Sequence, residues 1–405
     1  MANFQTTPLA IDAYARFMTD VFDERQIIKV STVFQAFFGR AENGGRTLFS
    51  PDSAVVDIDI LRGNERLAAM IHRGQDARDL GTSQKNTEQE NYSTISRIYP
   101  LIEEEGDISG NQLLFRRPGE LPFSTQTRLD RMRSHARDHH QEHIRRIVRL
   151  FEYLAGQSLL TGKMPAIFGT TDSNLLYDFL RPVGHIIGVP TPWDNAGSKP
   201  LDDIDNACDL IRQNGKAMAD VMLCGDDAFD AFVKHATVVA LADNRRFELI
   251  NVGTNPVPNN LQRFVDAGAI PRGRLRTPRG HELWMFTYLD VYTNAAGAAT
   301  KYMPVDECLI AASAARCDRY FGPPETLPDW PQRTQMYQQL FGFAPGLEPM
   351  PPGVKDVAAA INPAMFYFDA YPRPNWKGVT IRTQAAPIYA TTQTDAFVTL
   401  NTLMT

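Results

Sequence analysis

Four histidines on one predicted helix are the side chains of this sequence best suited to bind a metal or move protons. His135, His139 and His143 are spaced i, i+4, i+8, which brings them near one another on a helix, and imidazole nitrogens are common zinc ligands. His140 and His143, however, fall on the apolar stripe of that helix, where an imidazole packs and hydrogen-bonds a neighbour. No Cys, Asp or Glu triad elsewhere has metal-ligand spacing. We therefore favour packing or subunit contact for these histidines and predict no metal ion and no cofactor.

Arginines form a second group, within "IPRGRLRTPRGHE": Arg272, Arg274, Arg276 and Arg279. Clustered arginines contact phosphates in nucleic-acid-binding proteins. They equally suit a loop that pairs with acidic residues of a neighbouring subunit, such as Glu103 to Glu105. We favour the subunit interface over the phosphate site.

Motifs of known catalytic chemistry are missing from the sequence. It contains no G-x-x-x-x-G-K-[ST] loop, no G-x-S-x-G elbow and no H-E-x-x-H pair. Its cysteines are Cys208, Cys224, Cys308 and Cys317, with no C-x-x-C pair, which predicts buried free thiols in place of a zinc site or a disulfide framework. We predict no catalytic residue and no enzyme activity. A metal-dependent hydrolase that uses the histidine helix is a distant alternative.

Composition limits the class of protein. The chain has 405 residues, 43% hydrophobic and 22% charged, as in soluble globular proteins, and its length suggests two or three structural units. The formal net charge of −6 argues against a protein whose main task is to neutralise phosphates. No apolar run approaches the roughly 18 residues of a membrane span, and the N-terminus does not resemble a signal peptide. We expect no membrane partner and a product that stays in the cytoplasm of the cell that makes it.

Two amphipathic helices are predicted in the first half of the chain. The first covers 8–26 and has an apolar stripe. The second, over 124–161, carries the histidines; Ser124 or Thr125 can cap its start and Gly162 can end it. At 1.5 Å per residue this helix is about 55 Å long. The stripe of the first helix consists of Ile11, Tyr14, Phe17, Met18, Val21 and Phe22, and that of the second of Leu129, Met132, Ala136, Ile147, Leu150, Phe151 and Leu154.

Strand patterns occupy other parts of the chain. Residues 51–60 alternate, with Val56, Ile58 and Ile60 on one face, and 93–105 form a second strand-like stretch. Between them, 62–92 is polar and cannot bury enough surface to fold alone, which predicts a projecting hairpin. Residues 201–320 mix helices and strands as in a small α+β domain. A proline-rich stretch follows, and the C-terminal residues alternate like exposed strands.

This order of elements resembles the Hong Kong 97-type phage capsid fold, and four segments resemble the capsid protein E family of phage lambda. They are "FRRPGELPFSTQTRLDRMRSHARDHHQEHIRRIVRLFEYLAGQSLLTGK", "DDIDNACDLIRQNGKAMADVMLCGDDAFDAFVKH", "MPVDECLIAASAARCDRYFG" and a C-terminal pattern of Tyr371, Pro372, Gln384, Ala385, Ala386 and Pro387. Together they extend over about 290 residues in the order of that family. The proline-rich stretch of 322–362 is longer than the corresponding region of the lambda protein, which leaves its role open.

The resemblance implies an α+β, Hong Kong 97-type fold. The expected segments are an N-terminal arm (1–50), an extended β-hairpin loop with its flanks (51–122), a spine helix and peripheral domain (123–200), an axial domain (201–320), a proline-rich insertion (321–372) and C-terminal strands of the peripheral domain (373–405).

The implied function is that of the major capsid protein of a tailed double-stranded DNA phage. It would self-assemble into hexamers and pentamers of an icosahedral shell around the genome. A bacterial encapsulin-like nanocompartment shell protein is the alternative. Implied partners are further copies of the chain, a portal, a separate scaffolding protein, a maturation protease, a decoration protein at three-fold sites and non-specifically packaged DNA. The protein would reside in the virion after assembly in the host bacterial cytoplasm.

Inter-subunit contacts are expected at nine residues. We expect no covalent cross-link between subunits, because Lys85 is the single lysine between residues 30 and 162 and the lambda-like branch relies on non-covalent contacts. The contact residues are Phe17, Phe22, Arg73, Arg78, Lys85, Arg272, Arg274, Arg276 and Arg279.

Overall fold

The chain forms two compact units, which differ in their sheets. The computed structural model describes residues 30–50, 53–61, 92–109, 128–168, 175–243, 247–249, 257–294, 296–323, 365–372 and 378–403. Unit 1 comprises residues 1–30, 100–150 and 321–387, and unit 2 comprises 31–99, 151–320 and 388–405. Helix α4, Arg128–Thr161, contributes its first turns to unit 1 and its last turns to unit 2.

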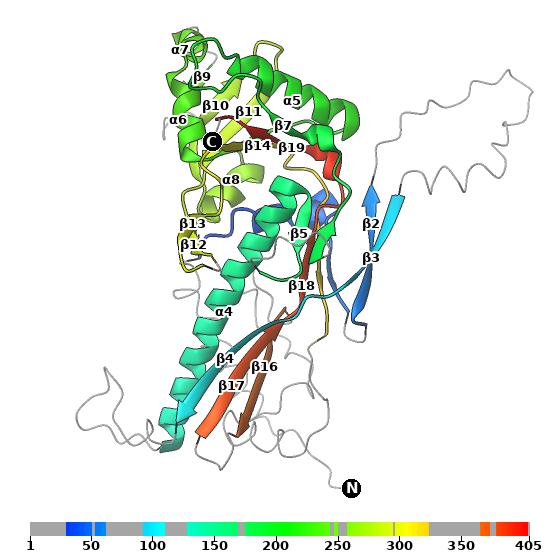
Figure 1. The fold of residues 1–405 in the computed structure, drawn as a ribbon, viewed down its shortest axis with the longest axis vertical. Helices are drawn as coiled ribbons and strands as arrows, with labels where there is room; N and C mark the ends of the chain where they lie inside the picture. Colours follow the sequence, from blue (N-terminus) through cyan, green and yellow to red (C-terminus); the bar gives the residue numbers. More distant parts are fainter. Residues whose placement is uncertain are drawn as a thin grey trace, which may run out of the picture. The chain divides into compact units, whose positions relative to one another are not determined.

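Unit 1 is built on a three-stranded antiparallel sheet in the order β16-β17-β4 (Figure 1). Its strands are β4, Ile102–Ser109; β16, Tyr367–Pro372; and β17, Gly378–Ala385. The first part of α4 supplies buried residues at helical spacing, among them Ala136, Ile144 and Ile147. The sheet supplies Ile108 and Ile381. The predicted helix is therefore confirmed over 128–161, while the proposed capping residues lie outside the described part of the chain.

The carboxyl end of α4 lies in unit 2 and stops where the sequence predicted. Gly162 has a positive φ of 71°, a conformation that glycine adopts without steric cost, and its N–H donates to Ser158 O at 3.1 Å. Arg181 adds a cation at this end, because its guanidinium donates to the carbonyls of Leu159 and Leu160 at 2.6 and 2.9 Å.

Unit 2 contains a seven-stranded mixed sheet in the order β7-β19-β14-β8-β11-β10-β9 (Figure 1). The central strands β8 and β14 are buried almost throughout, as expected for strands covered on both faces. The strands of this sheet are β7, Ile186–Gly188; β8, Val221–Cys224; β9, Phe247–Leu249; β10, Ile270–Arg276; β11, Glu282–Thr287; β14, Glu307–Ala311; and β19, Phe397–Asn401.

Helices pack against this sheet within unit 2. Helix α5 contacts β14 and β19, and α6 contacts β14. The helices are α5, Pro200–Asn214; α6, Asp226–Lys234; α7, Ala236–Asp243; and α8, Asn259–Asp266. Short 3-10 turns are η1, Gln35–Phe37; η2, Ala41–Asn43; η5, Val183–His185; and η8, Thr394–Ala396.

The sequence pattern of residues 226–244 predicts one continuous helix, and that prediction is wrong, because the structure has two helices there, α6 and α7. His235 interrupts it with an extended backbone, φ −68° and ψ 134°. The Nδ1 atom of His235 lies 2.7 Å from Thr237 Oγ1 and 3.4 Å from Thr237 N, so its side chain caps the start of α7. Local side-chain bonds of this kind compete with a continuous helical ladder.

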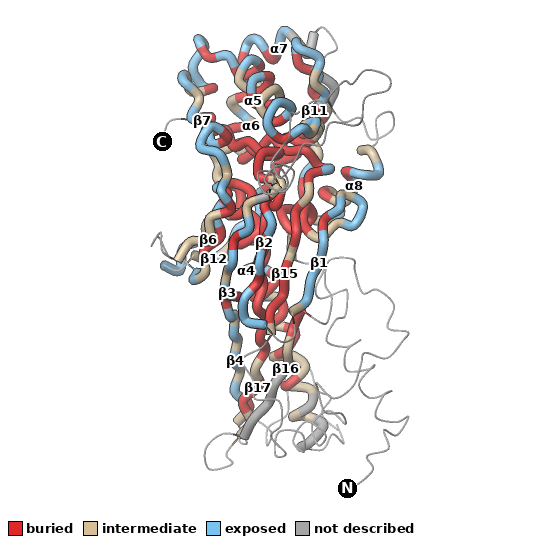
Figure 2. The backbone as a smooth tube through the Cα atoms, turned by 90° about the vertical axis from the view of Figure 1, so that its right-hand side faces the viewer, coloured by how far each residue is buried: buried red, intermediate tan, exposed pale blue. Residues whose placement is uncertain are grey.

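The predicted hairpin strands pair as β2, Val55–Leu61, and β3, Tyr92–Ile98, in an antiparallel two-stranded sheet. Along β2 the residues alternate, with Val56, Ile58 and Ile60 buried (Figure 2). The expected second strand over 93–105 is divided, because β3 ends before Pro100 and β4 joins the sheet of unit 1. Proline has no N–H for a strand ladder. The polar residues between β2 and β3 lie outside the described part of the chain.

The C-terminal strands differ from expectation in their burial. The sequence predicted exposed strands, but β17, β18 (Pro387–Ala390) and β19 are mostly buried. The structure also places β17 in the sheet of unit 1 and β19 in the seven-stranded sheet. The polar residues that made these strands look exposed include threonines whose hydroxyl groups are hydrogen-bonded inside the protein. Thr399, for example, donates to Leu160 O at 2.8 Å. The six expected segments stay a prediction, and the two units cut across them.

The remaining described strands form small sheets. One has the order β1-β15-β18, and the pairs β5–β6 and β12–β13 form two more. No helix in the described residues is long and apolar enough to cross a membrane. The strands are β1, Thr47–Phe49; β5, Lys163–Pro165; β6, Leu176–Asp178; β12, Val291–Thr293; β13, Ala299–Lys301; β15, Asp318–Phe321; and β18, Pro387–Ala390.

Candidate functional site

The root of the hairpin, defined as β2, β3 and the residues that hold them, is firmly tied into unit 2. Leu61 N donates to Thr392 O at 2.8 Å, where β2 leaves the described part of the chain. Where β3 ends, Tyr99 N donates to Ala54 O at 3.0 Å and Tyr99 Oη lies 3.2 Å from Ser50 Oγ. Both strands are thus fixed at the ends of their ladder.

The exposed face of the root carries polar cross-strand pairs along its length and an exposed apolar pair, Val55 and Ile98, at one end. Thr94 donates to Asp59 at 2.8 Å across the two strands. Tyr177 of β6 donates to Ile98 O at 2.7 Å, and the Arg97 guanidinium lies over the Tyr177 ring, 5.7 Å from its centroid. Cross-strand pairs and a cation–π contact stabilise a two-stranded sheet that would be marginal alone.

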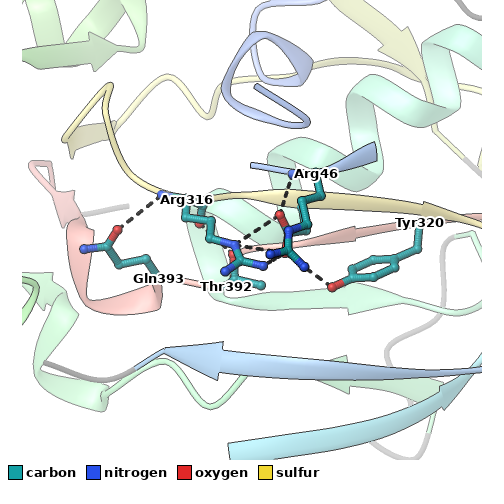
Figure 3. A network of polar contacts seen from close by, with 6 residues as sticks. Arg46, Arg316, Tyr320, Thr392 and Gln393 are labelled. Atoms are coloured by element: carbon teal, nitrogen blue, oxygen red, sulfur yellow. Dashed lines mark hydrogen bonds and ion pairs between the residues drawn. The ribbon is translucent and has the colours of Figure 1, made fainter. Parts of the chain in front are cut away.

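A buried carboxylate connects the segment before the root to the rest of unit 2. The carboxylate of Asp318 is contacted by the backbone N–H of Arg46 and by the side chains of Arg316 and Tyr320, the three residues labelled around it in Figure 3. Arg46 N donates to it at 2.7 Å and Arg316 Nη2 at 2.9 Å, while Asp318 is fully buried. A buried charge with a hydrogen-bonded cation is stable, whereas the same charge without its partner is costly.

The same network reaches the loop that holds β2. Thr392 Oγ1 donates to Arg316 O at 2.8 Å, and Arg316 N donates to Gln393 Oε1 at 3.2 Å (Figure 3). Thr392 is also the residue whose carbonyl receives Leu61 N. One continuous set of hydrogen bonds therefore runs from Arg46 through Asp318 and Arg316 to the end of β2.

Glu152 on α4 is a second buried acid of unit 2, and it holds the segment that begins at residue 31. Its carboxylate accepts hydrogen bonds from Phe34 N at 2.7 Å and from Gln35 N at 3.1 Å, with Gln35 Nε2 at 3.3 Å. The side chain is fully buried. Burial raises the pKa of Glu152 to about 7, although the hydrogen bonds from Phe34 and Gln35 oppose the rise.

The histidines of α4 lie in unit 1, against β17. His140 and His143 are 0% and 3% exposed, which confirms that they pack in the apolar stripe. The Nδ1 atoms of His140 and His143 lie 2.8 and 3.1 Å from Thr383 Oγ1. Since a hydroxyl has one proton, it donates to one imidazole and accepts from the other.

Burial keeps these imidazoles neutral. It lowers the pKa of His143 to about 4, assisted by His139 and Arg146, and it lowers the pKa of His140 well below its usual range. His139 sits at the edge, half-buried, with its ring centroid 6.0 Å from that of His143. In the described part of the chain, no three His, Cys, Asp or Glu side chains form a group suited to hold a metal.

The predicted arginines lie on β10 and just beyond it, and they pair inside the chain. Arg272 donates to Thr287 Oγ1 at 2.9 Å and lies over the Phe229 ring. Arg274 and Arg276 face Glu282, and Arg279 pairs with Asp209 of α5. These ion pairs are partly exposed. The expected contact of the four arginines with a neighbouring subunit stays a prediction. Phe17, Phe22, Arg73, Arg78 and Lys85 lie outside the described residues.

Sequence reasoning missed three groups that the structure brings together. Glu152 follows Ile144 and Val148 at intervals of four, so a charge within the apolar stripe was a signal for a buried acid. Asp318 and Thr383 carried no such signal, because Arg46, which donates its N–H to Asp318, and His140, which lies beside Thr383, are each more than 200 residues away in the sequence. The prediction of buried free cysteines is confirmed for all four residues.

Comparison with known proteins extends these observations. The family model described as phage major capsid protein E matches residues 50–402. No curated protein sequence matches the chain. Among solved structures, a prophage capsid protein of Escherichia coli CFT073 is 14% identical, with a TM-score of 0.55, covering 96% of this chain and 98% of that one.

Two further structures are less similar. A phage-related protein of Bordetella bronchiseptica RB50 is 10% identical, with a TM-score of 0.44, covering 92% of each chain. An encapsulin of Synechococcus elongatus PCC 7942 is 9% identical, with a TM-score of 0.39, covering 88% of this chain and 85% of that one.

Proposed function

The chain belongs to the phage major capsid protein E family, and from that premise we propose that its copies form the hexamers and pentamers of an icosahedral shell around the double-stranded DNA of a tailed phage. It is a capsid protein and a component of the virion that assembles into multimeric shells. The predicted Hong Kong 97-type fold, with mixed helix and sheet, is confirmed. Phage capsid proteins and encapsulins share this fold, so the fold alone does not separate them. The family match favours the phage capsid protein over the encapsulin alternative.

The observation that best supports this function is the firmly held root of the hairpin. A base fixed at Leu61 and Tyr99 keeps β2 and β3 paired within the subunit, so the residues between the strands are free to serve contacts with other copies. The sequence between the strands is polar and supplies few large apolar side chains. Its backbone groups find partners on a neighbouring copy of the chain. We assign 62–91 to contacts between subunits on this basis.

The roles of the other segments follow from the family. Residues 1–50 act as an arm, 123–200 as spine helix and peripheral domain, 201–320 as the axial domain around the centre of each capsomer, and 373–405 as the closing strands. The 321–372 stretch lies at the outer surface or between subunits. These roles rest on the resemblance, together with the long α4 helix and the separate seven-stranded sheet.

Partners outside the chain also follow from the family. Assembly takes place in the host cytoplasm with a portal, a scaffolding protein and a maturation protease, and a decoration protein binds at three-fold positions. Packaged DNA contacts the inner wall non-specifically, which suits the net charge of −6. The chain itself performs no catalysis in this scheme.

Contacts between subunits involve Phe17, Phe22, Arg73, Arg78 and Lys85, and also the arginines of β10. Among the latter, Arg276 is 65% exposed and its closest approach to Glu282 is 4.0 Å, so it is the most available for a neighbour. Replacing it with alanine should change the stability of the chain by less than about 1 kcal/mol. A fall in shell yield without loss of stability identifies the interface.

Deletion of the hairpin loop tests the proposal. A variant that lacks 64–90, with β2 and β3 joined by Asn-Gly, should give a soluble chain that melts cooperatively, because the root is held by described residues of unit 2. Electron microscopy should then find no closed shells. If the isolated variant is unfolded, the loop belongs to the core and the assignment is wrong.

A second variant separates loop length from loop contacts. It replaces 64–90 with a Gly/Ser-rich segment of equal length, which keeps the separation of the strands and removes the side chains. Shells formed by this variant would contradict a specific role for the loop, whereas their absence supports it.

A further inference from the structure

Two buried thiols lie side by side on adjacent central strands of the seven-stranded sheet. Cys224 of β8 and Cys308 of β14 are directly opposite in the antiparallel register, and their sulfur atoms are 3.1 Å apart. Both side chains are fully buried. The neighbouring pair is joined by Gly225 N donating to Glu307 O at 3.0 Å. The cysteines therefore occupy a non-hydrogen-bonded position, where opposing side chains come closest.

The other two cysteines supply an internal contrast. Cys208 on α5 and Cys317 before β15 are equally buried and free. Among the described residues, neither of them makes a sulfur–sulfur contact. The geometry for a disulfide requires the two sulfurs to approach to about 2.05 Å, with Cα atoms roughly 4.4 to 6.8 Å apart. Opposed residues at a non-hydrogen-bonded position have Cα atoms about 4.5 Å apart and meet the second condition, so closing this pair needs only a small movement.

We propose that Cys224 and Cys308 are a modification site at which hydrogen peroxide closes a cross-strand disulfide in virions that have left the reducing cytoplasm. Thiols stay reduced in the cytosol and oxidise outside it. A small neutral oxidant is required because no larger molecule reaches side chains with no exposed surface. The pairing of the two cysteines depends only on the fold of the subunit. The proposed function matters only because a virion protein leaves the reducing cytoplasm when the virion does.

The chemistry balances in two steps. The sulfur of one cysteine attacks peroxide, the O–O bond breaks, and water and a sulfenic acid form. The second sulfur then attacks the sulfenic sulfur, the S–O bond breaks, and a second water leaves with the second thiol proton. Two sulfurs lose two electrons in total, and the two peroxide oxygens gain them. Burial raises the pKa of Cys308 well above its usual range, so the reaction is slow.

Mass spectrometry of particles and of unassembled chain tests the proposal. Each sample is incubated with hydrogen peroxide, quenched with catalase, denatured, alkylated and digested with trypsin. Lys216, Lys234, Lys301 and Arg316 place the two cysteines on separate peptides. The expected product is one cross-linked pair containing Cys224 and Cys308, lighter by two hydrogens than the sum of its peptides and split by dithiothreitol. Cys208 and Cys317 should be alkylated.

Variants provide the control. Cys208→Ala combined with Cys317→Ala should still cross-link, and Cys308→Ala should not. The oxidised chain should melt about 5 °C or more above the reduced chain, and the shift should vanish with dithiothreitol.

Several results would overturn the assignment. They are four alkylated cysteines after peroxide treatment, a link that involves Cys208 or Cys317, or equal over-oxidation of all four. Since the link is scored in unassembled chain as well, a failure to form shells leaves the disulfide test intact and counts only against the proposed function.

Discussion

Replacing Glu152 with glutamine should change how the stability of the chain depends on pH. Burial raises the pKa of this carboxyl from 4.5 to about 7 in the folded chain. The unfolded chain therefore releases the proton at lower pH than the folded chain does. Below pH 4.5 the group is protonated in both states and its contribution to stability is fully present. As the pH rises through 7 that contribution is lost.

The size of the effect follows from the shift. At about 1.4 kcal/mol per pKa unit, the change from 4.5 to about 7 amounts to about 3 kcal/mol over the whole range. Between pH 5 and pH 8 the wild-type chain should lose about 2 to 3 kcal/mol from this group alone. Glu152→Gln stays neutral and accepts one of the two backbone hydrogen bonds, so it should lack this dependence.

Urea denaturation of the purified chain at pH 5 and pH 8 measures the difference. The free energy of unfolding of the variant, relative to wild type, should rise by about 2 to 3 kcal/mol from pH 5 to pH 8. Glu142→Gln is the matched control, because Glu142 lies on the same helix, is partly exposed and pairs with Arg145 and Arg146. A constant difference between Glu152→Gln and wild type at the two pH values would refute the linkage.

Three further predictions concern the other sites. The pH dependence of stability due to His143 has the opposite sign to that of Glu152, because the pKa of His143 is lowered from 6.5 to about 4. Urea denaturation should show about 3 kcal/mol of stability lost as the pH falls from 6.5 to 4, and His143→Gln should remove that loss. Asp318→Asn should cost about 2 kcal/mol, measured by the same assay, because the partly buried guanidinium of Arg316 loses its fully buried carboxylate partner. Particles denatured by boiling should run as a monomer near 45.4 kDa, and a ladder of bands lost on Lys85→Ala would contradict the absence of a cross-link.

Elements with a long, regular hydrophobic period could be predicted from the sequence. The α4 helix repeats its apolar stripe over many turns, and Ala136, Ile147 and Phe151 are buried as the period required. Strand β2 alternates with the period of two, so its inward side chains were equally plain. In both elements the local pattern and the tertiary environment agree.

Elements whose boundaries depend on a local side-chain bond or on a distant partner could not be predicted. Nothing in the hydrophobic pattern of 226–243 marks the break at His235, which results from its bond to Thr237. The assignment of β3 and β4 to different sheets depends on which strands are present to pair with them, since β4 joins β17 from the far end of the chain. Pairing between strands so far apart in the sequence depends on the tertiary structure and not on the local sequence pattern.

The hydrogen-bond partners of the buried acids could not be predicted from the sequence. Periodicity predicts that a position is buried, but it does not say which group satisfies the polar atom placed there. Glu152 is matched to the backbone of Phe34, and Asp318 to that of Arg46, across 118 and 272 residues of sequence. An apolar side chain would tolerate several packings at these positions, whereas a carboxylate deprived of its donors leaves a costly buried charge. Each buried acid therefore restricts the segment that it holds to one register.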